Sequence, residues 1–467
     1  MPHSLVAERF RQTCRDKRDD VAVRSLSDGN ASTFSDLLGE FERIRVRLDA
    51  CGVRPGAAVV AQVGNRAIFF PLFAACMDLG AAFVGLGDAT DAEVSALVER
   101  SGAVAVVTEH GVTTPPKTDT PSFGKSVVLK LTSGSTDLPK AAVASERHLV
   151  NDGRHIVEAM GIGASDVNLS CIPLSHSYAL GNVVMPLILQ GTPVALRHTF
   201  NPAQFVQDVE AGGATVFPGV PFMFDRLKAL DLPRLPAPMR LLITAGARID
   251  VETVRWFHSH LRCKVHSFYG SSETGGICYD DSETLADPLR VGRAMPETAV
   301  TVRPPDDEDA AGRVFVRGNA VSQGYADADA DDPISRFCDG GFLTGDLGLV
   351  DADGRLMLTG RVSNAVNVAG RKVDPTEVER ALLGLPGIGD ARVLGMACDV
   401  RGQQVVAFVV RKDATLTSLA IRQQCAATLS PYKIPRRFVF LERLPVDARG
   451  KIDRRALQAL AALGDTL

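Results

Sequence analysis

The sequence predicts an α/β fold, with a large N-terminal part and a small α+β domain after about residue 360. The chain has 467 residues, too many for one hydrophobic core, so two or more domains are expected. Before residue 360, short apolar runs alternate with helical patterns, which is typical of a mostly parallel sheet with covered faces. After it, longer strand patterns surround a few helical ones.

The first strong element is a helix near the N-terminus, over residues 34–50. Thr33 or Ser35 can cap its start, and Gly52 suits its end. Its apolar residues repeat at helical spacing and form one face: Phe34, Leu37, Leu38, Phe41, Ile44 and Leu48. Six apolar runs then predict buried strands, at residues 57–63, 81–87, 104–110, 193–197, 214–220 and 240–246.

The C-terminal pattern begins with the helix start Asp-Pro-Thr-Glu at 374–377, which has Pro at the first helical position and a capping-box Glu. Strands are predicted at 391–397, 403–411 and 436–444, with a helix over 417–430 between the last two. We therefore expect two domains, 1–360 and 361–467.

Charge and composition exclude several classes of partner. The net charge is −4 and no dense basic patch is present, which disfavours nucleic acid. No uncharged apolar run approaches the length of a membrane span, so no membrane insertion is expected. Nine dispersed cysteines without a C-x-x-C pair are typical of reduced thiols in the cytoplasm, where we expect the protein to be.

A hydroxyl-rich loop follows the apolar run 127–131, in the sequence LTSGSTDLPKAAVAS (131–145). Its hydroxyls can donate hydrogen bonds, Gly134 allows close backbone approach to an anion, and Lys140 adds a positive charge, so the loop suits phosphate. It is not a Walker A loop, because Pro139 and Ala141 replace the second Gly and the Ser or Thr of that motif. The segment AAVAS after it is predicted to be a strand.

Four later stretches complete a constellation: SFYGSSETGG (267–276), FLTGDLG (342–348), GRVSNAVNVAGRKVDPTEVE (360–379) and SPYKIPRRFVFLERLPVDARGKIDRR (430–455). With the loop, and in this order, they closely resemble the adenylate-forming family of acyl- and aryl-CoA synthetases, luciferases and peptide-synthetase adenylation domains. The resemblance runs from the helix at 34–50 to Lys451. It implies a large α/β adenylation domain of several subdomains and a small mobile C-terminal domain. It also implies that ATP activates a carboxylic acid to an acyl-adenylate, which a thiol then takes, releasing AMP.

The resemblance assigns most of the polar residues to ATP and Mg²⁺. Ser272 would touch the α-phosphate and Glu273 would bind Mg²⁺, a hard cation suited to oxygen ligands. Asp346 would accept hydrogen bonds from the ribose hydroxyls, and Arg361 would hold the ribose or phosphate from the other side. The other nucleotide-binding residues that it implies are Thr132, Ser133, Gly134, Ser135, Thr136 and Lys140 for the β- and γ-phosphates, and Gly246, Ala247, Tyr269, Gly270 and Ser271 around the adenine and the α-phosphate.

The resemblance makes Ser272, Glu273 and Lys451 catalytic, and Lys451 would carry the adenylation step by bridging the acyl carboxylate and the α-phosphate. The small domain would then rotate about a hinge just after Arg361, and the loop around Gly370 would line the tunnel for the thiol. The chain departs from the family pattern at Asp137, Ser363 and Asn367, which bears on ATP affinity and on the rotation.

The resemblance also places candidate residues at the acyl pocket: His176, Tyr178, Phe217, Gly219, Val220, Gly275, Gly276 and Ile277. The stretch PLSHSYALGN (173–182) has no Asp to pair with an α-ammonium, so an amino acid is disfavoured. An aryl acid and a medium acyl chain both stay open. His176 fits a hydrogen-bonded loop histidine as well as an acyl-gate role.

The acceptor thiol and the class of protein have alternatives. No carrier domain follows within this chain, so the thiol is expected to come from CoA or from the phosphopantetheine of a separate acyl carrier protein. A non-catalytic adenylate-binding protein is a second interpretation, and a member that transfers the acyl group to oxygen or nitrogen is a third. The sequence gives no indication of the oligomeric state.

Overall fold

The computed structural model divides into two compact units that do not follow a single cut in the sequence. The large unit comprises residues 1–301, 315–343 and 351–356, and the small unit comprises 302–314, 344–350 and 357–467. The structure describes residues 4–87, 89–116, 123, 127–131, 140–232, 234–283, 285, 289–304, 312–326, 335–362, 366–368, 371–373, 375–398, 402–426, 428–429, 432–446 and 452–463. The domain boundary at 360/361 stays a prediction.

The large unit begins with helices whose ends follow local sequence signals. α1 is Leu5–Asp16 and α2 is Phe34–Ala50. Thr33 caps α2 through a capping box with Asp36, because each side chain bonds the other residue's backbone N–H. This settles the choice between Thr33 and Ser35. The predicted apolar face is buried, with Leu38 partly so.

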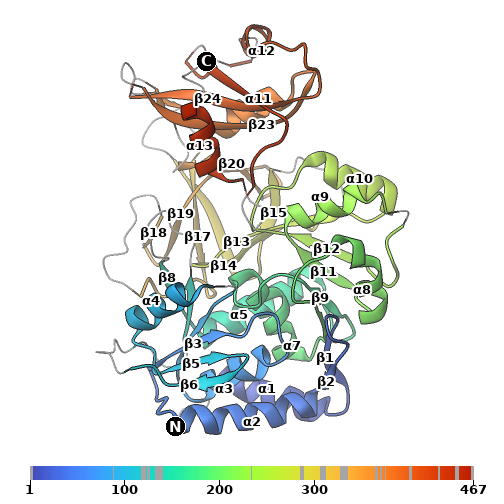
Figure 1. Ribbon diagram of the computed structural model, residues 1–467, viewed down its shortest axis with the longest axis vertical. Coiled ribbons are helices and arrows are strands. Elements are labelled where there is room, and N and C mark those ends of the chain that lie inside the picture. Colours follow the sequence, from blue (N-terminus) through green and yellow to red (C-terminus); the bar gives the residue numbers. More distant parts are fainter. Residues whose placement is uncertain are drawn as a thin grey trace. The chain divides into compact units, whose positions relative to one another are not determined.

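The strand that precedes the predicted phosphate loop belongs to a six-stranded sheet. Its order is β6 (Gly111–Thr113), β5 (Ala105–Thr108), β3 (Ala58–Gln62), β4 (Ala82–Gly85), β7 (Val127–Leu131) and β8 (Ala141–Ser145). The four middle strands are parallel, and β6 and β8 pair antiparallel at the edges. The helices α3 (Phe69–Asp78) and α4 (Asp91–Ser101) pack on it (Figure 1). The predicted strand AAVAS is confirmed as β8.

The second sheet of the large unit supplies the other predicted motifs. Nine strands of this fourteen-stranded sheet lie in the order β15 (Arg290–Ala294), β14 (Gly275–Tyr279), β13 (Val265–Ser271), β12 (Leu241–Thr244), β11 (Val216–Gly219), β9 (Asn168–Ser170), β10 (Val194–Leu196), β1 (Val21–Ser25) and β2 (Ala31–Thr33). Strands β13, β12, β11, β9, β10 and β1 are parallel to their neighbours within that run, as a βα alternation requires. All six apolar runs predicted before residue 250 are strands.

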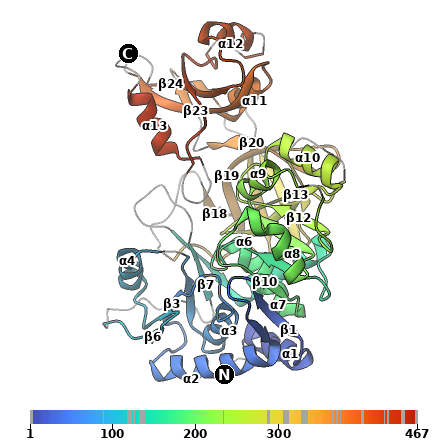
Figure 2. The ribbon, with the colours of Figure 1, turned by 45° about the vertical axis from the view of Figure 1, so that its right-hand side comes forward.

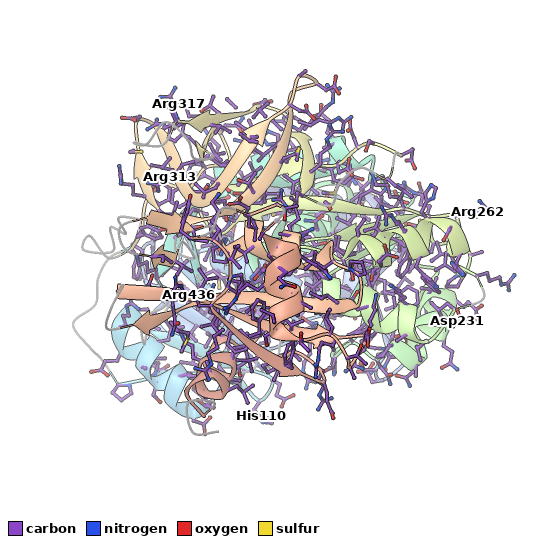
Figure 3. The ribbon with its side chains drawn as sticks, turned by 90° about the horizontal axis from the view of Figure 1, so that it is seen from above. His110, Asp231, Arg262, Arg313, Arg317 and Arg436 are labelled. Atoms are coloured by element: carbon purple, nitrogen blue, oxygen red, sulfur yellow. The ribbon has the colours of Figure 1, made fainter. Side chains whose placement is uncertain are left out.

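Helices cover both faces of this sheet. On one face lie α8 (Phe205–Gly212), α9 (Pro221–Ala229) and α10 (Val251–Leu261), which Figure 2 shows side by side next to β12 and β13. On the other lie α5 (Glu146–Met160), α6 (Ser177–Ala179), a π-helical turn at Leu180–Val184 and α7 (Met185–Gln190). The remaining short turn is 3₁₀, at Pro202–Gln204. The ends of α9 and α10 carry positive-φ residues, Asp231 and Arg262, both labelled in Figure 3.

Several strands run from one unit into the other. β16 (Thr298–Arg303), β17 (Gly312–Gly318), β19 (Gly341–Val350) and β20 (Arg355–Arg361) each have residues in both units. β18 (Arg336–Cys338) is a short strand paired with β19 in the large unit.

The small unit is built on its own sheet, with the order β22 (Arg371–Val373), β21 (Val366–Val368), β24 (Gly402–Arg411) and β23 (Ile388–Cys398), and with β25 (Arg437–Leu441) paired to β24. Its helices are α11 (Pro375–Leu383), α12 (Ser418–Cys425) and α13 (Arg454–Leu463). The helix start at Pro375 and the three predicted strands are confirmed. The helix predicted over 417–430 is shorter: α12 ends at Cys425, whose carbonyl then accepts from Thr428 N at 3.1 Å in a three-residue turn.

The α/β fold class is confirmed. In the described part of the chain, no helix is both long and apolar enough to cross a membrane.

Candidate active site

The centre of the candidate site is the tight turn between β13 and β14. The strands pair antiparallel up to Ser271 and Gly275, so residues 272–274 form the tip. The Ser271 and Thr274 hydroxyls lie 3.0 Å apart, and Thr274 also donates to the Gly275 carbonyl at 3.0 Å. These bonds fix the backbone that presents Ser272 and Glu273. Ser272 Oγ lies 3.2 Å from the hydroxyl of Ser177.

Tyr325 fixes the carboxylate of Glu273. Its hydroxyl donates to Glu273 Oε1 at 2.9 Å, and the Glu273 carbonyl accepts from Ser322 N at 2.7 Å. The Tyr325 ring is itself held, because it packs edge-on against Phe337 with 5.2 Å between centroids. One side of the Glu273 carboxylate is therefore oriented by a neutral donor.

Lys140 lies at the same place. Its Nζ is 5.5 Å from the centroid of the Tyr325 ring, a cation–π distance. It directly precedes β8. A loop lysine and a turn carboxylate, far apart in sequence, thus share one tyrosine. The segment 323–326 makes this possible, because it pairs with β8: Val143 N donates to the Gly324 carbonyl at 2.9 Å and Ala326 N to the Ala141 carbonyl at 2.8 Å.

The residues suit a magnesium ion bound together with a polyphosphate. Among the described residues, no three His, Cys, Asp or Glu side chains are placed to hold a metal ion by themselves. Mg²⁺ is commonly held by one or two carboxylates together with phosphate oxygens and water. Glu273 offers one such carboxylate, already oriented at Oε1.

Two further nucleotide candidates pair with each other in the small unit. Arg361 Nε donates to Asp346 Oδ1 at 2.5 Å, and Asp346 N donates to the Thr344 hydroxyl at 3.1 Å. Asp346 is nearly buried at the centre of β19, and Arg361 ends β20. Because β19 and β20 are neighbours in the sheet, the Asp346 and Arg361 side chains come within hydrogen-bonding distance.

The adenine candidates follow the ends of strands in the large unit. Gly246 and Ala247 come directly after β12, and Gly246 has φ of +84°, a conformation that L side chains rarely adopt. Tyr269 and Gly270 lie on β13 at a register shift before the turn.

The acyl-pocket candidates come from α6 and its cap, from β11 and the residue after it, and from β14. His176 caps α6, and its Nδ1 accepts from Tyr178 N at 3.3 Å. Tyr178 is almost fully buried: its hydroxyl donates to the Ile243 carbonyl at 3.3 Å and its ring lies 5.8 Å from that of Phe268. Burial raises the pKa of Tyr178.

Phe217 is fully buried among aromatic rings, with 5.1 Å to the centroid of Phe205 and 5.5 Å to that of Phe224. Gly219 ends β11 and Val220 follows it before α9, whereas Gly275, Gly276 and Ile277 begin β14. The acyl-pocket roles stay predictions.

Several predicted residues lie outside the described part of the chain: Thr132, Ser133, Gly134, Ser135, Thr136, Asp137, Ser363, Gly370 and Lys451. The described residues thus bring together Lys140, Ser272 and Glu273, and add Tyr325 and Ser177, which the sequence reasoning missed. The only local signal for Tyr325 was an aromatic residue in VSQGYA, a short stretch without periodicity.

Comparisons with known proteins cover nearly the whole chain. The family model described as AMP-binding enzyme matches residues 10–127 and 109–326, and the one described as AMP-binding enzyme C-terminal domain matches 377–451. Triostin synthetase I of Streptomyces triostinicus is 31% identical, covering 96% of this chain and 93% of its own length. 4-Coumarate–CoA ligase 5 of Oryza sativa subsp. japonica is 26% identical, covering 99% and 95%. The crystal structure of ATP-bound MatB from Rhodopseudomonas palustris aligns with a TM-score of 0.81 at 25% identity, covering 97% and 98%.

Proposed function

Because this chain belongs to the AMP-binding enzyme family and is an acid–thiol ligase, we propose that it activates an aryl or acyl carboxylic acid, and not an amino acid, with Mg·ATP and transfers the acyl group to CoA. In the first step a carboxylate oxygen of the acid attacks the α-phosphorus, and the bond to pyrophosphate breaks. In the second, the thiol sulfur attacks the acyl carbon, and AMP leaves.

The observation that carries the proposal is the convergence of Lys140 and Glu273 on Tyr325. A pentacoordinate phosphorus carries more negative charge than its ground state, so positioned cations and donors stabilise it. Lys140 supplies a mobile cation beside the triphosphate. Tyr325 holds Glu273 in one orientation, and a magnesium ion bound there would neutralise phosphate charge. Ser272 supplies a hydroxyl for the α-phosphate.

The small unit contributes the remaining roles. The Asp346 carboxylate, held by Arg361, would accept from the ribose hydroxyls, and the bond from Asp346 N to the Thr344 hydroxyl holds its backbone. Lys451 would bring its ammonium to the carboxylate and the α-phosphate in the adenylation step. Asp137 departs from the family pattern in the predicted phosphate loop, and Ser363 and Asn367 depart from it at the predicted hinge, so these are the positions at which ATP affinity and the domain rotation would differ from the family.

The relatives support CoA as the acceptor, since 4-coumarate–CoA ligase 5 is named for that thiol. The crystal structure of ATP-bound MatB supports ATP as the nucleotide that this chain uses. The absence of an Asp in PLSHSYALGN supports an acid without an α-ammonium.

The test is acid-dependent pyrophosphate release with a panel of aryl and acyl acids, with and without CoA. We expect release with at least one class of acid and its near-abolition in Lys451→Ala. Full activity in that variant would refute the role of Lys451. Mass spectrometry then distinguishes thioesters of CoA from those of a phosphopantetheinylated carrier protein. An adenylate that forms but yields neither thioester would point to transfer to oxygen or nitrogen, and nucleotide binding without pyrophosphate release to a non-catalytic protein.

A further inference from the structure

A buried lysine lies on the strand that enters the phosphate loop. Lys130 is the fourth residue of β7, and only 3% of it is exposed. Lysine is rarely buried this deeply without a partner of opposite charge, because desolvation disfavours the ammonium. Its position therefore calls for a charge-based explanation.

The register of the strands gives the direction of the side chain. Lys130 pairs with Ala142 of β8, and Ala142 pairs with Tyr325 across an antiparallel bridge. Directly opposed residues of antiparallel strands point to the same face, so the three side chains form a row with the small Ala142 in the middle. At the far end of the row the Tyr325 hydroxyl bonds Glu273. Lys130 thus lies on the face where the candidate site is built.

A second carboxylate lies under the turn. Asp152 of α5 is buried, and its Oδ1 accepts from Gly276 N at 2.8 Å. A Cβ atom built on Gly275, which has φ of +68°, would lie 2.5 Å from the same oxygen. The carboxylate therefore packs directly against the backbone that follows Glu273.

The carboxylates of Asp152 and Glu273 act on the Lys130 ammonium, and burial together with the Lys130 charge lowers the pKa of His148. Burial lowers the pKa of Lys130, and the two carboxylates oppose this by raising it. Burial likewise raises the pKa of Asp152, and the Lys130 charge opposes that shift most strongly. The Lys130 ammonium thus offsets one of the two negative charges, those of Asp152 and Glu273, at a site that is proposed to bind a polyanion.

We propose that Lys130 is a positioning residue for nucleotide binding, whose buried ammonium offsets Asp152 so that an anionic triphosphate can lie beside Glu273 and Lys140. The inference deepens the proposed function and rests on it. It gives the strand before the phosphate loop an electrostatic role that the loop motif itself does not contain. It also predicts that the sum of the buried charges, rather than Lys130 alone, sets the affinity for ATP.

Three variants separate charge from structure. Lys130→Met leaves the site one unit more negative, Asp152→Asn one unit more positive, and the double variant restores the wild-type sum. Asparagine keeps an oxygen that can accept from Gly276 N. Lys264→Met is the matched control, because Lys264 is equally buried and bonds Asp280 at the other end of the same β13–β14 hairpin.

Calorimetric titration with Mg·ATP in the absence of acid measures the affinity, and thermal unfolding measures the integrity of each variant. A unit charge about 10 Å away at an effective dielectric constant of about 20 changes a binding constant by about tenfold. We expect Lys130→Met to weaken ATP binding by about that factor, Asp152→Asn to bind at least as tightly as wild type, and the double variant to return to within about threefold. Lys264→Met should leave ATP affinity within about twofold while lowering the unfolding temperature.

The outcomes that overturn the inference are distinct from a failure of the proposed function. Unchanged affinity in a folded Lys130→Met, or a double variant as weak as Lys130→Met, would refute the charge role. If Lys130→Met does not fold, weakened ATP binding in folded Asp152→Asn would refute it instead. If wild type itself binds no ATP, the proposed function fails.

Discussion

The contact between Tyr325 and Glu273 can be tested by removing one oxygen atom. Tyr325→Phe deletes the hydroxyl that donates to Glu273 Oε1 at 2.9 Å, but it keeps the ring that lies 5.5 Å from Lys140 Nζ and packs on Phe337. A hydrogen bond to a charged group contributes about 1.5–3 kcal/mol. Glu273 is partly exposed, so water can replace some of the lost donor, and the lower end of that range applies.

The expected loss is therefore about tenfold in kcat/KM for Mg·ATP, since about 1.4 kcal/mol corresponds to a factor of ten. Pyrophosphate release measured over a range of Mg²⁺ concentrations at fixed ATP should show a higher Mg²⁺ requirement, because the carboxylate is no longer held in one orientation. The KM for the acid should change little. Tyr279→Phe is the control, since Tyr279 is a buried tyrosine of β14 whose ring stacks on His266. A folded Tyr325→Phe with wild-type Mg²⁺ dependence would refute the reasoning.

Three other predictions concern the stability and reactivity of the large unit. Lys264→Met removes the 2.6 Å partner of buried Asp280 and leaves Arg355 Nη1 at 3.6 Å, so urea unfolding should show a loss of about 1.5–3 kcal/mol, and no measurable loss would contradict it. Burial raises the pKa of the Asp166 carboxyl, but hydrogen bonds from Arg240, Gly163 N and Thr215 outweigh it, so the pKa in the folded chain is lowered. The stabilisation of the folded chain by the charged carboxylate is therefore present above the unfolded pKa, and it is lost as pH falls through the lower folded pKa. Below about pH 4 the free energy of unfolding should therefore fall less steeply with falling pH in Asp166→Asn than in wild type. The same pH dependence in both proteins would be inconsistent with this. Burial raises the pKa of Cys171 to about 12, so alkylation of the native chain at pH 8 should leave this thiol unmodified until it unfolds, as peptide mapping would show.

Patterns of short range were predicted correctly from the sequence. The helix over 34–50, the six early strands and the strand after the phosphate loop all depend on residues close in the chain, so periodicity and caps suffice. The family resemblance is also confirmed, because its motifs are local stretches in a fixed order. The end of the helix predicted over 417–430 was placed too late, since helix ends depend on a few backbone bonds that composition does not specify.

Contacts across the chain could not be predicted in this way. Tyr325 reaches Glu273 only because residues 323–326 pair with β8, and no local signal in VSQGYA indicates that pairing. Lys130 stands in the run VVLKL, where a lysine is more typical of an exposed strand face. The carboxylate that acts most strongly on its charge is that of Asp152, which lies on α5. Both residues are found by register and burial, and these exist only in the folded chain.

The pairing of Leu131 with Ala141 links these observations to the phosphate loop. Leu131 and Ala141 thus lie opposite each other on β7 and β8, one before and one after the stretch predicted to bind phosphate. Lys130 directly precedes Leu131, and Lys140 directly precedes Ala141, so the two ammonium groups come from β7 and from the residue just before β8. One lies over the Tyr325 ring and the other lies two strands away on the same face. Both lysines lie near the Glu273 carboxylate, so a change in either should alter the affinity for the magnesium-bound triphosphate at Glu273. In a double-variant cycle the effects of the two changes on that affinity should be non-additive.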